Sequence, residues 1–130
     1  MRTAVIRKSR NQPSPPPVDV AAFWAGIARE LAVSADGPLN IAQLAVDRHA
    51  ASAHADKTAF RFLDEAGSRR DVSYRELAAL TDRFANLLGD LGVKKGDCVF
   101  VLCGRIPELY VAVLGALKFG AVVSPLFQAF

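Results

Sequence analysis

The chain has 130 residues, of which 52% are hydrophobic and 22% are charged. This composition allows a buried core and excludes an intrinsically disordered protein, because disordered chains are poor in apolar residues. The net charge of +3 arises in the first seventeen residues, which hold four basic side chains and no acid. The rest of the chain has 12 basic and 13 acidic residues, so it lacks the basic face typical of a nucleic-acid-binding domain.

The predicted elements begin after a polar, proline-ending tail at residues 1–17. Asp19 can cap a helix that runs to about Ala32, because apolar residues recur there at helical spacing. The apolar face of that helix consists of Val20, Phe23, Trp24, Ile27 and Leu31. A second helix is expected from Asn40 to about Ala53. Its inward residues are expected to be Ile41, Leu44 and Ala45.

The pattern then changes to alternation over Thr58–Leu63, which predicts a strand, and Asp71–Tyr74 is predicted to return beside it as a β-hairpin. Ser73 and Glu76 have the spacing of a capping box, which begins the clearest helix of the chain at residues 74–91. The buried stripe of this helix is expected to contain Leu77, Leu80, Phe84, Leu87, Leu88 and Leu91.

A continuous apolar run, Cys98–Cys103, is typical of a strand covered on both faces. A helix follows over Glu108–Phe119, with Pro107 at its first position and Gly120 at its end. Ala121–Pro125 is expected to be a second buried strand. Such a βαβ unit has parallel strands and a right-handed crossover. The predicted fold class is therefore α/β: a helical N-terminal segment, a β-hairpin and the first βαβ unit of a larger parallel sheet.

The predicted βαβ unit needs more cover than the other elements offer. A helix that is apolar on all sides and two parallel strands require neighbours on every face. The last segment, Leu126–Phe130, is apolar and contains no stop signal. We therefore expect that further chain completes the sheet. The alternative is a small domain that self-associates through its uncovered apolar surface.

The most apolar region, Val99–Phe127, is interrupted by three charged residues, which excludes a membrane span. Cys98 and Cys103 lie at opposite ends of one predicted strand, too far apart for a disulfide. They are interpreted as reduced core thiols. Reduced thiols, and a first twelve residues without an apolar signal region, indicate the cytoplasm.

Most patterns that could carry catalysis favour a structural interpretation. His49 and His54 are five residues apart, so a continuous helix would turn them away from one another, whereas helical metal ligands favour a separation of four. Asp64 and Glu65 are paired carboxylates, but a hairpin turn favours such residues for its backbone. No metal ligand and no catalytic residue are predicted from these positions.

Arg105 is the charge that most suggests a ligand site, because it follows a predicted strand at the edge where α/β sheets bind ligands. The alternative is a structural ion pair with a carboxylate. Gly115 and Gly120 have the spacing of a phosphate loop but not its Lys-Ser/Thr ending, so they are expected to serve packing.

Three segments follow one another in a distinctive order. The first combines Phe23-Trp24, Leu39-Asn40-Ile41-Ala42 and Val46-Asp47-Arg48-His49. The second runs from Ser73-Tyr74-Arg75-Glu76-Leu77 through Arg83-Phe84-Ala85-Asn86 to Leu91-Gly92-Val93-Lys94-Lys95-Gly96-Asp97-Cys98-Val99. The third contains Arg105-Ile106-Pro107-Glu108-Leu109-Tyr110, Gly115-Ala116 and Gly120-Ala121-Val122-Val123. In this order and spacing, they resemble the AMP-forming acyl-CoA synthetases of the acetyl-CoA synthetase type.

The prolines of residues 1–17 predict a disordered tail, which the resemblance does not cover. For the rest of the chain, the resemblance implies a helical extension of the acetyl-CoA synthetase type (18–55) and the start of an AMP-binding, or adenylating, domain (56–130). It also implies a ligase in which acetate or another short-chain carboxylate attacks ATP, and CoA then displaces AMP to give the acyl-CoA. Mg²⁺ would offset the phosphate charge. The ATP-handling motifs of such enzymes are absent from these residues, so the chain alone is expected to be inactive.

The resemblance implies one site at the end of the chain. Phe127-Gln128-Ala129-Phe130 lies where acetyl-CoA synthetases run Phe-Gly-Gly-Phe along bound CoA, so Phe127, Gln128 and Ala129 are the expected CoA-lining residues. Gln128 and Ala129 replace two glycines, which restricts how closely a ligand can approach the backbone.

Two other functions remain open at this point. One is a non-catalytic binding or assembly module derived from such a ligase. The other is a fragment of a dinucleotide-binding oxidoreductase, which the βαβ unit suggests and the missing G-x-G-x-x-G disfavours.

Overall fold

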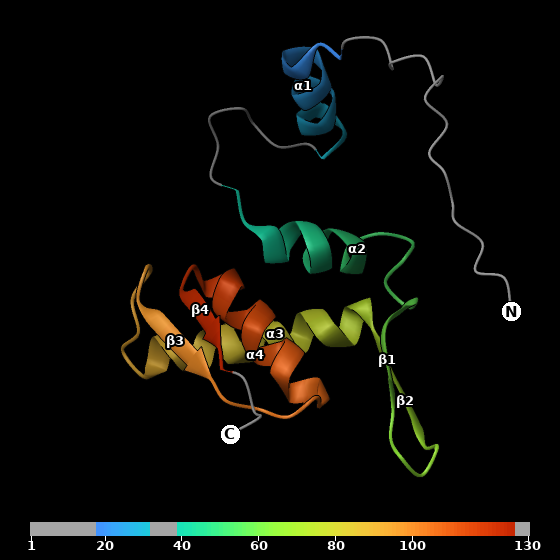
Figure 1. Ribbon diagram of the computed structural model, residues 1–130, viewed down its shortest axis with the longest axis vertical. Coiled ribbons are helices and arrows are strands. Elements are labelled where there is room, and N and C mark those ends of the chain that lie inside the picture. Colours follow the sequence, from blue (N-terminus) through green and yellow to red (C-terminus); the bar gives the residue numbers. More distant parts are fainter. Residues whose placement is uncertain (1–17, 32–38, 127–130) are drawn as a thin grey trace, which may run out of the picture. The chain divides into compact units, whose positions relative to one another are not determined.

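The computed structural model describes residues 18–31 and 39–126, and these fall into two compact units that divide after Gly37 (Figure 1). The first unit contains helix α1 (Val20–Glu30). Asp19 caps it by accepting a 3.1 Å hydrogen bond from the backbone N–H of Ala22, which confirms the predicted start. No residue of α1 is buried, so its apolar face has no cover among the described residues of this unit.

The second unit begins with a π-helical turn, η1 (Gln43–Asp47), that continues into α2 (Arg48–Ala50). Asn40 precedes it, and its Oδ1 accepts the backbone N–H groups of Ala42 and Gln43 at 3.0 and 3.3 Å. The helical start predicted at this asparagine is therefore confirmed. The regular helix ends three residues earlier than expected.

The predicted inward face of this segment is wrong. Ala42 and Val46 are buried, whereas Ile41 is 59% exposed, Ala45 is exposed and Leu44 is only partly buried. Polar contacts that Asn40 and Asp47 make with the end of helix α4 (Pro107–Phe119) hold the helical turn in this orientation. A count of apolar residues along the sequence contains no information about those contacts.

Strands β1 (Thr58–Leu63) and β2 (Arg69–Ser73) form the predicted antiparallel hairpin. The returning strand begins two residues earlier than expected, because pairing extends to Leu63 and Arg69. Asp64 stabilises the turn, since its Oδ1 accepts the backbone N–H of Ser68 at 2.7 Å. The structural interpretation of Asp64 is therefore confirmed.

The carboxylate of Asp71, on β2, lies between two arginines. Arg61 donates two hydrogen bonds to it, of 2.8 and 3.2 Å, and Arg69 donates from the same strand. The hydrogen bonds from Arg69, and then those from Arg61, hold the pKa of Asp71 well below its ordinary value of 3.8. This ion pair is exposed, so it links the hairpin strands without forming part of the core.

Replacing Arg69 or Arg61 by glutamine is expected to raise the pKa of Asp71 toward 3.8, because each substitution removes hydrogen bonds to the charged form. A lowered carboxyl pKa contributes stability that is present above the unfolded value and is lost as pH falls through the folded value. Carboxyl ¹³C shifts, followed from pH 7 downward, measure the titration. Arg75→Gln, which removes a partner of Asp56, is the control and should leave Asp71 unchanged. A wild-type midpoint near 3.8 would contradict the prediction.

Helix α3 (Tyr74–Asp90) begins at Ser73, whose Oγ accepts the backbone N–H of Glu76 at 3.1 Å, as the capping box predicted. The buried stripe differs from the expected one. Its buried residues are Leu77, Thr81 and Leu88, and the expected Leu80 and Phe84 are partly buried. Leu87 and Leu91 were also expected in the stripe, but they are 48% and 69% exposed. They lie on a neighbouring face of α3 that helix α4 does not cover.

The βαβ unit consists of β3 (Cys98–Val101), α4 (Pro107–Phe119) and β4 (Val122–Pro125), and its strands are parallel as predicted. Figure 1 shows the hairpin near one end of α3 and this strand pair near the other. The expected cover on both faces is not found in residues 39–126. Phe100 and Val122 are 64% and 55% exposed, because α3 and α4 pack on the other face of the strands.

The two cysteines are both free, as expected, but they are not both in the core. Cys98 is exposed on the uncovered face of β3, whereas Cys103 lies beyond the end of that strand and is partly buried. The interpretation as core thiols is therefore wrong for Cys98.

Two small clusters make up the core of the second unit. The buried members of the first are Val46, Val72 and Leu77, and those of the second are Leu88, Ala116 and Ala121. Gly115 lies at a close contact between α3 and α4: a Cβ there would be 2.9 Å from Cβ of Phe84 and 3.0 Å from the carbonyl oxygen of Thr81. This confirms the packing role expected for Gly115. No helix within 18–31 or 39–126 is long and apolar enough to cross a membrane.

Gly120 ends α4 with a φ of +90°, in the left-handed region, as predicted for a helix stop. Gly120→Ala is expected to lower the free energy of unfolding by about 1–2 kcal/mol, because an L side chain is strained at this φ. A Cβ would also be 3.2 Å from Cγ of Lys95. Urea unfolding followed by circular dichroism measures the loss. Gly120→Asn should lose less, since asparagine tolerates this region better. An equal loss in both variants would show that backbone strain is not the cause.

Candidate functional site

An open groove of about 320 Å³ lies between the end of the hairpin and the segment that joins β3 to α4. Three arginines line it: Arg69 and Arg70 from β2, and Arg105 from the joining segment. Apolar side chains line the remainder, among them Leu63 and Ile106, which are 70% and 44% exposed. The groove therefore combines positive charge with apolar surface that water still covers.

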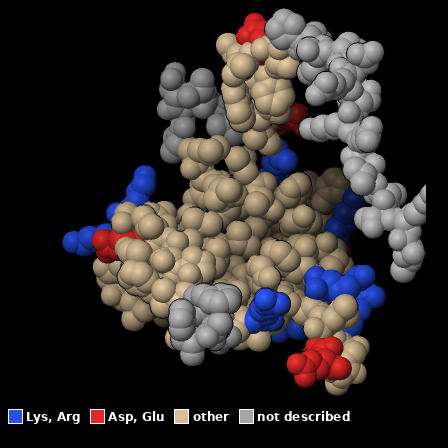
Figure 2. All heavy atoms as spheres, viewed as in Figure 1, with Lys and Arg blue, Asp and Glu red and all other residues tan. Residues whose placement is uncertain are grey.

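The arginines differ in how firmly they are paired. Arg69 is held by Asp71. Arg70 lies 3.8 Å from Glu76 and 3.8 Å from Glu108, the longest ion pairs recorded in this unit. Arg105 forms no ion pair or hydrogen bond with any residue in the described ranges, which disfavours the structural ion pair offered as its alternative. Basic side chains gather over the hairpin on the face drawn in Figure 2.

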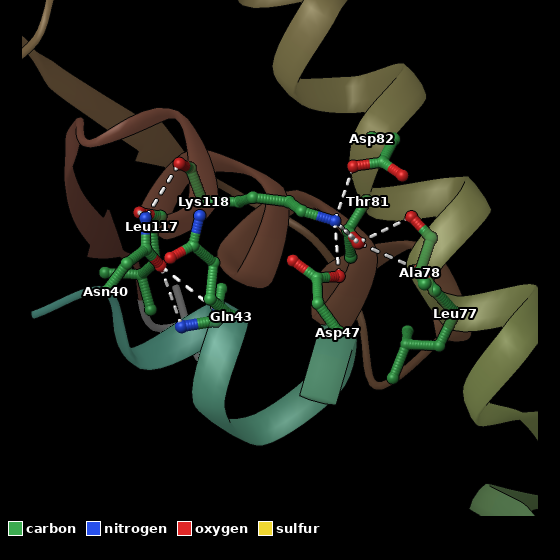
Figure 3. A network of polar contacts seen from close by, with 10 residues as sticks. Asn40, Gln43, Asp47, Leu77, Ala78, Thr81, Asp82, Leu117 and Lys118 are labelled. Carbon is green, nitrogen blue, oxygen red and sulfur yellow. Dashed lines mark hydrogen bonds and ion pairs between the residues drawn. The ribbon is translucent and has the colours of Figure 1, made fainter. Parts of the chain in front are cut away.

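A second polar site joins three segments around Lys118, near the end of α4 (Figure 3). The ammonium lies 2.6 Å from Oδ1 of Asp47 and 2.5 Å from Oδ1 of Asp82, and the side chain is 12% exposed. Thr81 is fully buried beside it, with its hydroxyl 3.5 Å from Nζ. One lysine of α4 thus joins η1 to α3.

The backbone at the same place is also capped. Nδ2 of Asn40 donates to the carbonyl oxygens of Lys118 and Leu117, at 2.9 and 3.3 Å. The last carbonyl groups of a helix have no partner within the helix, so this amide satisfies groups that would otherwise need water. Asn40 therefore caps η1 with its oxygen and α4 with its nitrogen.

The two carboxylates beside Lys118 stabilise the charged form of its side chain. Desolvation by burial lowers its pKa, but hydrogen bonds from the ammonium to Asp47 and Asp82, and the charges of both carboxylates, outweigh this effect and raise the pKa above 10.5. The ammonium is therefore fully charged at pH 7. All its near partners are structural groups of this unit, so its geometry is that of a clasp between elements rather than of a proton donor facing a ligand.

The sequence analysis does not predict this clasp, because there Lys118 is only one of the three charged residues that interrupt the apolar region Val99–Phe127. A signal was present. A lysine in the last turn of an otherwise apolar helix needs a carboxylate partner when it is buried. Asp47 and Asp82 could be chosen only once η1 and α3 were placed against α4.

The other predicted positions are distributed as follows. Phe127, Gln128 and Ala129, the expected CoA-lining residues, lie outside the described ranges. The rings of His49 and His54 lie 6.2 Å apart, because α2 ends at Ala50 and the continuous helix assumed between them does not exist. Within residues 18–31 and 39–126, no three His, Cys, Asp or Glu side chains converge as metal ligands would.

Comparison with known proteins gives consistent relatives. The chain is 43% identical to the acetyl-coenzyme A synthetase of Streptomyces avermitilis over 95 residues, and 41% identical to that of Bacillus subtilis over 110 residues. These matches cover 73% and 82% of this chain. The chain spans only 15% and 19% of the length of those relatives.

Solved structures show the same likeness. A crystal structure of an acyl-CoA synthetase from Brucella canis matches with a TM-score of 0.66 and 31% identity, over 80% of this chain and 19% of that one. A fatty acid AMP ligase from Legionella pneumophila matches with a TM-score of 0.63 and 25% identity, over 68% of this chain and 15% of that one. The α/β fold class is thereby confirmed.

Residues 47–130 match the model of the AMP-binding enzyme family. The matched range includes the α3–α4 contact, the βαβ unit and all three charged residues of the clasp. The resemblance seen in the sequence is therefore confirmed at the level of the family. The chain belongs to the AMP-binding enzymes.

Proposed function

We propose that the chain is the N-terminal part of an acetate or short-chain acyl-CoA ligase, which converts ATP, a carboxylate and CoA to acyl-CoA, AMP and pyrophosphate. The observation that carries this proposal is the 41% identity to the Bacillus subtilis acetyl-coenzyme A synthetase over 110 residues. That match extends over most of the chain, so it is not a single shared motif. Since this chain spans 19% of that relative, most of the catalytic machinery would lie in other residues.

In this proposal, the described residues build a scaffold. The clasp at Lys118 fixes the end of α4, and α4 leads directly into β4, after which the expected CoA-lining residues 127–129 follow. CoA would supply the thiol that accepts the acyl group, and ATP with Mg²⁺ would supply the activated phosphate.

We also propose a division of the chain into a tail at 1–17, an extension at 18–55 and the start of the AMP-binding domain at 56–130. Residues 39–55 of the extension pack within the second unit through Asn40 and Asp47. We therefore propose that this part of the extension works as an integral part of the adenylating domain. The cytoplasm is the proposed location, because both described thiols are free.

A graft tests the proposed function. The chain would replace the segment of the Bacillus subtilis acetyl-coenzyme A synthetase with which it aligns, and acetate-dependent formation of acetyl-CoA would be measured with propionate and butyrate as alternatives. An active chimera, together with an inactive isolated chain, is expected. A chimera that folds and binds ATP but forms no thioester with any of the three acids would overturn the proposal.

One observation favours the non-catalytic assembly module as second candidate. Large apolar side chains are exposed on and beside the strands of the βαβ unit, namely Phe100, Leu102, Val122 and Leu126. Sedimentation equilibrium of the purified chain distinguishes the candidates. A discrete, cooperatively melting oligomer supports the module, and a monomer or an aggregate of undefined size contradicts it. The oxidoreductase alternative receives no support, since the family matched is that of AMP-binding enzymes.

A further inference from the structure

The groove between the hairpin and Arg105 has no role in the proposed ligase scaffold, yet it has the properties of a small binding site. Its volume of about 320 Å³ is at the lower end of the range of roughly 300–1,000 Å³ that is usual for ligand pockets. Three arginines and one acidic residue, Asp64, are among the residues that line it. The lining is therefore positive, and the size suits one charged group with a small attachment.

The charge available to a ligand comes from two of the arginines. Arg69 is committed to Asp71, so it contributes little. Arg105 has no partner in the described residues, and the two ion pairs of Arg70 are long and exposed. Exposed ion pairs at such distances contribute little free energy, so an anion in the groove can compete for Arg70. The planar guanidinium fork suits the paired oxygens of a phosphate.

The carboxylates around the groove limit where an anion can lie. Asp64 is at the hairpin end, and its Oδ1 accepts the backbone N–H of Ser68. Glu76 and Glu108 are beside Arg70 at 3.8 Å. An anion would therefore be repelled near the turn of the hairpin and near Glu76 and Glu108. The most favourable place is toward Arg105, where no carboxylate lies within 4.0 Å of the guanidinium in the described ranges.

The apolar lining provides a second, independent observation. Leu63 and Ile106 are large apolar side chains that are 70% and 44% exposed, and both line the groove beside the arginines. A free inorganic anion would leave this surface in water. A ligand that carries an apolar or planar group next to its phosphate would cover it, and covering apolar surface is favourable.

We propose that this groove binds a phosphate ester, with the phosphate at Arg105 and Arg70 and an attached apolar or planar group against Leu63 and Ile106. The proposal rests on residues other than the predicted CoA-lining residues 127–129, and it requires binding only. It can therefore fail while the ligase proposal succeeds, or succeed while the ligase proposal fails.

The test uses the full 130-residue chain labelled with ¹⁵N and phenyl phosphate as the probe. Inorganic phosphate and phenol, which correspond to the two parts of the probe, are the comparison ligands. Saturable shifts of the amide signals of Arg70, Arg105 and Ile106 are expected with phenyl phosphate, and much weaker ones with either half. Raising the salt concentration should weaken binding, because the contacts are exposed. Equal affinity for inorganic phosphate and phenyl phosphate would overturn the proposed apolar contact, and with it the proposal.

Two groove variants and one control locate the site. Arg105→Gln and Arg70→Gln are each expected to weaken phenyl phosphate binding about tenfold, because each loses hydrogen bonds to a charged group. Arg83→Gln, an exposed arginine of α3 outside the groove, should leave the affinity unchanged. No saturation up to about 10 mM, or the same loss in all three variants, would overturn the proposal.

Two further titrations identify the source of the phosphate. ATP and coenzyme A both carry phosphates on a planar, partly apolar nucleoside. Arg105-dependent binding of either one supports the site, and the tighter of the two names the source. If neither produces a saturable shift at the groove although phenyl phosphate does, the ligand is a smaller phosphate ester, in keeping with the volume.

Discussion

Gly115→Ala is expected to lower the free energy of unfolding of the second unit by about 2–3 kcal/mol, in spite of alanine's better helix propensity. The new Cβ would be 2.9 Å from Cβ of Phe84 and 3.0 Å from the carbonyl oxygen of Thr81. Neither atom can move without shifting α3, because one is a carbonyl oxygen and the other is attached directly to the backbone. The loss of unfolding free energy therefore reports the cost of moving the two helices apart to make room for the new Cβ.

Gly89→Ala is the matched control, since it places the same group in α3 with only an ordinary contact of 3.5 Å to Phe119. It is expected to be neutral or slightly stabilising, by up to about 1 kcal/mol. Urea unfolding should be followed by far-ultraviolet circular dichroism, because this signal reports on the helical content of α3 and α4 directly, whereas the single tryptophan, Trp24, belongs to the first unit. An unchanged midpoint for Gly115→Ala would contradict the close helix contact.

Lys118→Met is expected to be the other large effect, with a loss of about 3 kcal/mol. It removes the cation between Asp47 and Asp82 and leaves two carboxylates facing one another. Breaking a buried pair from one side costs about 3–5 kcal/mol, and the lower end applies here because Asp82 is 58% exposed. The same unfolding experiment measures it. Methionine keeps most of the side-chain volume, so the change reports on charge.

Two controls separate the clasp from a general effect of charge. Lys57→Met removes an exposed lysine of the same unit and should change stability by less than about 0.5 kcal/mol. Adding Asp47→Asn to Lys118→Met should recover part of the loss, because one of the two unpaired carboxylates is then neutral. If Lys118→Met loses no more than Lys57→Met, the clasp does not hold η1 in place.

The clasp also predicts a response to alkali. The pKa of Lys118 is raised above 10.5, so its contribution to stability is complete below the unfolded value and is lost as pH rises through the folded value. The difference in stability between the wild type and Lys118→Met should therefore remain constant between about pH 7 and pH 10 and decrease above that range. A difference that disappears near neutral pH would contradict the assignment.

Local signals in the sequence predicted the secondary structure well. The cap at Asp19, the capping box at Ser73, Pro107 at the start of α4 and Gly120 at its end all lie where they were expected. Each is a short-range effect, because a side chain satisfies backbone groups within four residues or a φ angle admits one residue type. The parallel βαβ unit followed from the same kind of information, combined with the handedness of crossovers.

The faces that become buried could not be predicted equally well. Ile41 was expected inside and is exposed, whereas Thr81 was not expected and is fully buried. Thr81 lies inside because Gly115 lets α4 approach α3 at that position. The hydroxyl of Thr81 is satisfied there, since it donates to the carbonyl oxygens of Leu77 and Ala78 at 2.9 Å. The pattern of apolar residues along α3 does not reveal the shape of the surface that α4 presents to it.

The sequence by itself determined the family, the order of the elements and the positions where helices begin and end, because these depend on residues close together in the chain. The tertiary structure alone decided which charges act together. Lys118, Asp47 and Asp82 are brought together from three segments, and Arg70 and Arg105 line one groove although 35 positions separate their residue numbers. The energies of such groups depend on distance and desolvation in space, and spacing along the sequence specifies neither.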